Sequence, residues 1–141
     1  MEAIDTFYGD AQILRGLSLE IGAGETVCLL GRNGRGKTTT IKSILGLVPV
    51  RQGRIAFDGA DITRLPTHLI ARRGIGWVPD NRRIFPTLTV ERNLGMARQH
   101  APPPLAGGRA WTLARVYNRF PILARLRHRT GEDLSGAGAQ L

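Results

Sequence analysis

The chain has 141 residues, of which 42% are hydrophobic, and this is enough apolar material for one globular domain with a buried core. No apolar run approaches the roughly 20 residues that span a bilayer, and the N-terminus lacks a secretory pattern, so we expect a cytoplasmic protein without a transmembrane segment of its own. The net charge of +9 comes almost wholly from residues 71–141, which hold twelve basic and four acidic groups, and since aromatic residues do not interleave with these charges we expect no nucleic-acid partner.

The first elements expected along the chain are two strands and a helix, with a glycine-rich loop before the helix. Residues 16–21 alternate apolar and polar side chains, as a half-buried strand does, and residues 26–30 (TVCLL) form the continuous apolar run of a fully buried strand. Cys28 lies inside this run, where we expect a buried and unreactive thiol. Apolar residues at helical spacing predict a helix over 37–47.

In the middle of the chain, further strands alternate with a helix. Residues 54–57 have the pattern of a strand that is closed by a turn at Asp58 and Gly59, and Pro66 suits the first turn of a helix that runs through Arg73. Residues 75–78 form another short apolar run, which we interpret as a strand. Strands and helices that alternate after a glycine-rich turn indicate an α/β domain.

The last third of the chain is expected to be helical. Thr89 can cap a helix through about residue 98, and the prolines and glycines of residues 102–108 form a linker. A second helical region follows over 110–129, with an interruption at Pro121. We interpret this stretch as an inserted helical subdomain.

The segment GRNGRGKT matches the phosphate-loop pattern G-x-x-x-x-G-K-[ST], with Gly31, Gly36, Lys37 and Thr38 at the fixed positions. Glycines let the backbone turn its N–H groups toward phosphate oxygens, and the following helix presents its positive end there. Lys37 would reach the β and γ phosphates, and the Thr38 hydroxyl would ligate Mg²⁺. We therefore predict that a nucleotide and Mg²⁺ bind along the loop, at Gly31, Arg32, Asn33, Gly34, Arg35, Gly36, Lys37 and Thr38.

Several stretches together resemble an ATP-binding subunit of an ABC transporter: Tyr8-Gly9, ILRGLSLEI, GETVCLLGRNGRGKTTTIKSILGL, GRIAFDGADIT, GIGWVPDNRRIFPTLTVERNL and the LSG at Leu134. The resemblance covers nearly the whole chain and is similar to importers of branched-chain amino acids and related amides. It implies the ABC type of P-loop NTPase fold, with an N-terminal antiparallel strand region. The ATP-binding core would occupy residues 1–99, and residues 100–141 would begin a helical subdomain.

The resemblance also implies roles for residues outside the loop. Tyr8 would stack on adenine, and Thr39 would add a hydroxyl to the α-phosphate. Asp80 stands where the superfamily usually has a Gln that contacts Mg²⁺ and the attacking water. Ser135 and Gly136 would use a helix N-terminus to contact the γ-phosphate held by an opposite subunit, although Ala137 replaces the next glycine of that signature. From the residues alone, a packing tyrosine, a loop aspartate and an ordinary helix cap remain open interpretations.

The sequence stops at Leu141, before the Asp-Glu strand and the switch histidine of the resembled family. The resemblance therefore implies a chain that is truncated after the signature, with an incomplete fold, and that binds ATP without hydrolysing it alone. In its full context the subunit would dimerise and energise import through membrane permeases at the inner face of the plasma membrane. A non-catalytic remnant, and a soluble ABC ATPase that acts on nucleic acid, remain open alternatives.

Overall fold

The computed structural model describes residues 1–79, 84–99 and 110–137. The chain divides into two compact units, Met1–Ile75 and Gly76–Leu141, and each is described by itself. None of the helices in the three described ranges is long and apolar enough to cross a membrane.

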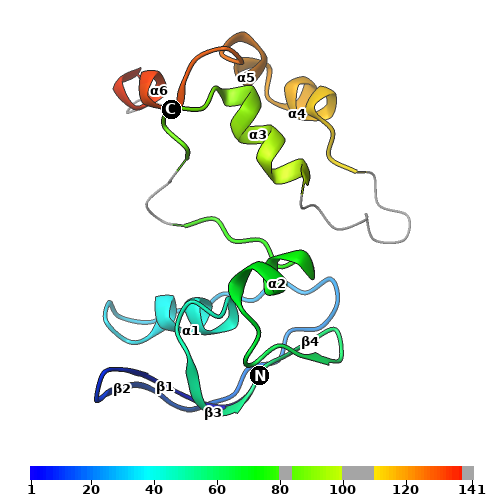
Figure 1. Cartoon of the computed structure of the whole chain (residues 1–141). Helices are drawn as coiled ribbons and strands as arrows, with labels where there is room; N and C mark the ends of the chain where they lie inside the picture. Colours follow the sequence, from blue (N-terminus) through cyan, green and yellow to red (C-terminus); the bar gives the residue numbers. More distant parts are fainter. Residues whose placement is uncertain (80–83, 100–109, 138–141) are drawn as a thin grey trace. The chain divides into compact units, whose positions relative to one another are not determined.

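The first unit is built on a three-stranded antiparallel sheet (Figure 1). Its strands are β1 (Glu2–Tyr8), β2 (Ala11–Leu17) and β3 (Val50–Arg54), in the order β2-β1-β3. The expected antiparallel strand region is thus present, but β2 begins five residues before the strand predicted at 16–21 and ends at Leu17, so residues 18–21 are not in a strand. The reason is the tight turn after β1, which pairs Tyr8 with Ala11 and so begins the second strand at once.

A small hairpin follows β3 and confirms the predicted turn. Strands β4 (Ala56–Phe57) and β5 (Ala60–Asp61) pair across Asp58 and Gly59, whose φ angles of 49° and 74° are those of a type I′ turn. The single strand predicted over 54–57 is instead divided at Ile55. That residue is 3% exposed, and it enters the core between the sheet and the hairpin.

Two helices cover the sheet of the first unit: α1 (Lys37–Ile44) and α2 (Thr67–Arg72) (Figure 1). Helix α1 ends three residues earlier than predicted, because Gly46 adopts a φ of 66°. The amides of Gly46 and Leu47 then donate to the carbonyls of Ser43 and Lys42, at 3.1 and 2.9 Å, which is a Schellman motif.

The core of this unit joins the sheet, the hairpin and α2. It consists of Ile4, Leu14, Ile55, Ile62 and Ile70, each at most 5% exposed. Apolar residues from both strands of the β1–β2 hairpin and from α2 therefore hold the sheet and its helical cover together.

The strands predicted at 26–30 and 75–78 do not form. Both stretches are irregular, Val27 and Leu30 are 43% and 88% exposed, Val78 is 90% exposed, and the Cys28 thiol that was expected to be buried is exposed. A strand buried on both faces needs hydrogen-bonded neighbours, and none of the described strands pairs with either stretch. Both predicted strands are therefore wrong, and so is the burial predicted for residues 26–30.

The second unit is helical, as predicted. It contains α3 (Val90–Gln99), α4 (Leu113–Arg119), α5 (Pro121–Arg125) and α6 (Gly131–Ala137). The Thr89 hydroxyl accepts from the Arg92 amide at 3.3 Å at the start of α3, and Pro121 separates α4 from α5 by taking the first position of α5. The predicted cap and the predicted interruption are both confirmed.

Candidate functional site

The glycine-rich loop leads directly into α1, and the helix begins at the lysine of the motif. Gly36 is the N-cap residue, no side chain caps the helix, and its first turn holds no acidic residue. The Thr40 amide and hydroxyl both donate to the Gly36 carbonyl, at 2.8 and 3.0 Å. The first amides of α1 and its positive dipole end are thus directed toward the loop, as anion binding requires.

Position 36 requires glycine for two reasons. Its φ of 87° is a left-handed conformation that other residues rarely adopt, and a Cβ atom there would lie 2.8 Å from Leu14 Cδ2 and 3.6 Å from Ile13 Cγ2. The end of the loop therefore rests directly on β2. This close approach fixes the start of α1 against the sheet.

The ammonium group of Lys37 is folded back across the loop. Its Nζ donates to the carbonyl oxygens of Gly31 and Arg32, at 2.5 and 2.9 Å. These two bonds hold the positive charge beside the backbone at the start of the loop. The third proton of the ammonium remains for an acceptor outside the loop.

The other loop residues that were predicted to bind nucleotide differ in accessibility. Arg32, Asn33, Gly34 and Arg35 are exposed, as is Thr38 in the first turn of α1. The arginines add positive charge around Lys37, which favours an anionic ligand. Thr39, in contrast, is 7% exposed.

Tyr8 lies at the end of β1 and is 47% exposed. Strand β1, which carries Tyr8, is bonded to α1. The hydroxyls of Thr6 and Ser43 lie 3.0 Å apart in a buried hydrogen bond. The motif itself gave no sign of Ser43 or Thr40 as supporting residues. Only helical spacing could have indicated them, since Thr39, Thr40 and Ser43 form the buried side of α1.

The remaining predicted site residues are Asp80, Ser135 and Gly136. Asp80 lies outside the described residues. Ser135 and Gly136 belong to α6, but this helix begins at Gly131, so neither stands at the helix N-terminus that was expected. The reason is a different cap: the Thr130 hydroxyl accepts from the Asp133 amide at 3.4 Å, and the Asp133 carboxylate accepts from the Thr130 amide at 3.2 Å.

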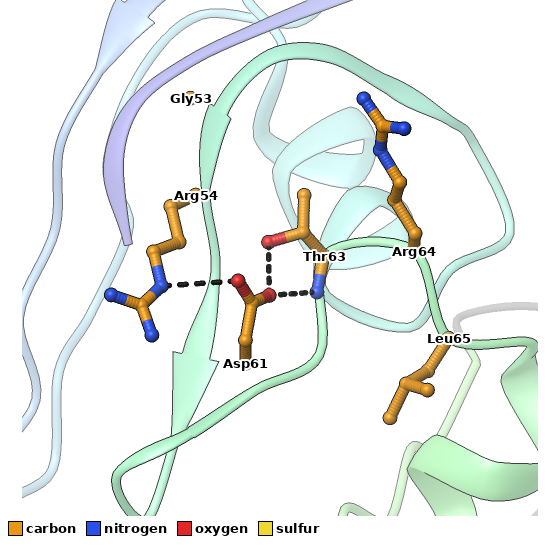
Figure 2. A pocket seen from close by; sticks show the side chains of 6 residues that line it. All are labelled: Gly53, Arg54, Asp61, Thr63, Arg64 and Leu65. Atoms are coloured by element: carbon orange, nitrogen blue, oxygen red, sulfur yellow. Dashed lines mark hydrogen bonds and ion pairs between the residues drawn. The ribbon is translucent and has the colours of Figure 1, made fainter.

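An open hollow of about 500 Å³ lies elsewhere in the first unit, and Figure 2 shows its lining by Gly53, Arg54, Asp61, Thr63, Arg64 and Leu65. Arg54 Nε and Asp61 Oδ2 form an exposed ion pair at 3.1 Å. Hydrogen bonds from the Thr63 hydroxyl and amide, with the charge of Arg54, lower the pKa of Asp61. The Asp61 carboxylate already accepts hydrogen bonds from Arg54 and Thr63. The hollow therefore offers a ligand less than the phosphate loop does, and the loop is the better candidate site.

Residues 14–141 match the family described as ABC transporter. The lipopolysaccharide export ATP-binding protein LptB of Haemophilus influenzae is 39% identical over 92% of this chain and 53% of its own length. The branched-chain amino acid transport ATP-binding protein BraG of Pseudomonas aeruginosa is 40% identical over 67% of this chain and 41% of its own length. The chain thus spans about half the length of these relatives, or less.

Solved structures of ABC transporter proteins have a similar fold. A nucleotide-free ATP-binding cassette from an ABC transporter matches 97% of this chain and 58% of its own, with a TM-score of 0.68 and 25% identity. Another cassette, solved in an ADP conformation, has a TM-score of 0.66 over 96% of this chain and 57% of its own, with 26% identity. The predicted P-loop fold of ABC type is confirmed. The chain therefore belongs to the ABC transporter family, as a nucleotide-binding protein with the fold of the ATP-binding cassette.

Proposed function

We propose that the chain is the ATP-binding subunit of an ABC importer for branched-chain amino acids or related amides. The observation that carries the nucleotide assignment is the position of Lys37, whose ammonium is held on the Gly31 and Arg32 carbonyls beside the open N-terminus of α1. The likeness to the branched-chain amino acid transport protein BraG supports the substrate class.

The binding mode follows from the loop. The backbone amides of Gly34, Gly36 and the first turn of α1 would surround the β-phosphate, and Lys37 would exchange its carbonyl partners for phosphate oxygens. Thr38 is exposed in the first helical turn, so its hydroxyl fits a ligand of Mg²⁺, which would neutralise phosphate charge when bound. Thr39 would contact the α-phosphate, and Tyr8 would stack on the adenine.

Hydrolysis is a separate step with its own requirements. Phosphoryl transfer needs a group that orients the attacking water, and Asp80 is the acid that the family resemblance places for this role and for the metal. In a homodimer or heterodimer, Ser135 and Gly136 would face the γ-phosphate of the opposite subunit. We propose that these 141 residues alone bind ATP without turning it over.

A phosphate-release assay tests this statement. With purified chain, ATP and Mg²⁺, we expect no steady release above that of the buffer. Release that continues in the wild type and disappears in Lys37→Ala would contradict it, because such turnover would depend on this site.

The proposed setting follows the family. The cassette would pair with a second cassette and with membrane permease subunits at the inner face of the plasma membrane. Residues 1–99 would supply the ATP-binding core, and residues 100–141 the start of the helical subdomain.

Lipopolysaccharide is a second candidate for the transported substrate. The LptB relatives cover 92% of this chain, more than BraG does, and are named for lipopolysaccharide export. Disruption of the gene in its source organism separates the two. We expect slower uptake of labelled branched-chain amino acids with normal surface lipopolysaccharide, whereas unchanged uptake with depleted lipopolysaccharide would favour export.

A further inference from the structure

Arg51, which no motif singles out, holds the turn between β1 and β2. Its Nη2 donates to the Gly9 carbonyl at 2.9 Å, across 42 positions of sequence. Its guanidinium also lies over the Phe7 ring, 4.4 Å from the ring centroid, in a cation–π contact. One side chain of β3 therefore binds two residues of the β1–β2 hairpin.

The residue between these two anchors is Tyr8. It is the last residue of β1, pairs with Ala11 across the turn and is 47% exposed. Because 47% of Tyr8 is exposed, packing alone does not fix the orientation of its ring. Because Arg51 binds the residues on both sides of Tyr8, the backbone that directs the Tyr8 ring is restrained.

The same hairpin supports the phosphate loop. Leu14 and Ile13 of β2 lie against Gly36, and Thr6 of β1 bonds to Ser43 of α1. The turn that carries Tyr8 and the loop that carries Lys37 are thus connected through one short hairpin. A nucleotide whose phosphates lie on the loop would find its base partner on the hairpin that supports the loop.

We propose that Arg51 is a positioning residue for the base of the bound nucleotide, acting by holding Tyr8 in the orientation that stacks on adenine. The proposal rests on the proposed ATP-binding function. Pre-organisation of this kind contributes to affinity because the ring need not be ordered when the ligand binds. It predicts that loss of Arg51 weakens contacts to the base and leaves contacts to the phosphates intact.

Two ligands separate these contacts: ATP·Mg²⁺, and Mg²⁺-tripolyphosphate, which has no base. Calorimetric titrations would use the wild-type chain, Arg51→Ala, Tyr8→Ala and the double variant. We expect Arg51→Ala to weaken ATP binding about threefold to tenfold and to leave tripolyphosphate binding unchanged. The double variant should bind ATP no more weakly than Tyr8→Ala, since Arg51 acts through Tyr8.

Two further variants make the test decisive. Arg54→Ala removes an exposed arginine from the same strand, whose ion pair is with Asp61, and should leave both affinities unchanged. Arg51→Lys keeps a cation near Phe7 and should give the same pattern with a smaller loss, so it replaces Arg51→Ala if that variant does not fold.

Three results would overturn the inference: unchanged ATP affinity in Arg51→Ala, an equal loss for ATP and tripolyphosphate, or fully additive losses in the double variant. A wild-type chain that binds neither ligand would overturn the proposed function as well. Wild-type ATP binding that depends on Lys37 but not on Arg51 would overturn this inference alone.

Discussion

Lys37→Ala is expected to weaken ATP·Mg²⁺ binding by about 100-fold, a loss of ~3 kcal/mol, because charge-assisted hydrogen bonds to phosphate are among the strongest that a side chain makes. The structure adds a second effect. The Lys37 ammonium bonds to the Gly31 and Arg32 carbonyls, so its removal also deletes the two hydrogen bonds that tie the start of the loop to the start of α1. Titration calorimetry of the wild type and the variant measures the change.

The matched control for this prediction is Lys42→Ala. Lys42 lies in the last turn of the same helix, so its removal deletes an equal charge at the opposite end of α1. We expect its effect on ATP affinity to be less than about threefold, as for a screened surface charge. Equal affinities in Lys37→Ala and the wild type would remove the phosphate-loop assignment.

Gly53→Ala is expected to cost about 3 kcal/mol or more of unfolding free energy, the largest loss of stability that we predict for a single methyl group. Gly53 lies in β3 with a φ of 87°. A Cβ atom there would meet the Ala3 carbonyl oxygen and would lie 2.5 Å from the Glu2 carbonyl oxygen, both in the backbone of β1. Because backbone atoms cannot turn aside, the sheet itself would have to separate.

Gly59→Ala separates the two causes of this loss, which are the left-handed backbone conformation and the close contact with β1. Gly59 has a similar φ of 74°, but a Cβ atom there would meet nothing within 4 Å. This control should therefore cost only the left-handed conformation, about 1 kcal/mol. Urea unfolding measures both variants, and equal losses would mean that the contact between β3 and β1 is not as close as the structure places it.

Features that depend on neighbouring residues could be predicted from the sequence. The Asp58–Gly59 turn, the Thr89 cap and the break at Pro121 each rest on the conformational preference of one or two residues, and each is present. The phosphate-loop pattern is equally local, because its glycines and lysine lie within eight residues, and nucleotide binding there stays a prediction. Turns, caps and breaks of this kind can therefore be predicted from the residues that form them.

Features that depend on distant partners could not be predicted in this way. The apolar run at 26–30 has the composition of a buried strand, but hydrogen-bonded neighbours decide whether it is one. The Arg51–Gly9 bond joins residues 42 positions apart, and the contact of Gly53 with β1 depends on the register of two strands. Helix α6 begins before Ser135 because Thr130 and Asp133 form a cap at Gly131.

The most direct test of the central claim, that ATP binds on the loop before α1, is a titration of the ¹⁵N-labelled chain with ATP·Mg²⁺ followed by amide chemical shifts. We predict the largest shifts at Gly34, Gly36, Lys37 and Thr38, with smaller ones at Tyr8 and Gly9, and the same loop shifts with Mg²⁺-tripolyphosphate. Shifts confined to the hollow around Arg54 and Asp61, with the loop amides unchanged at saturating ATP, would contradict the account.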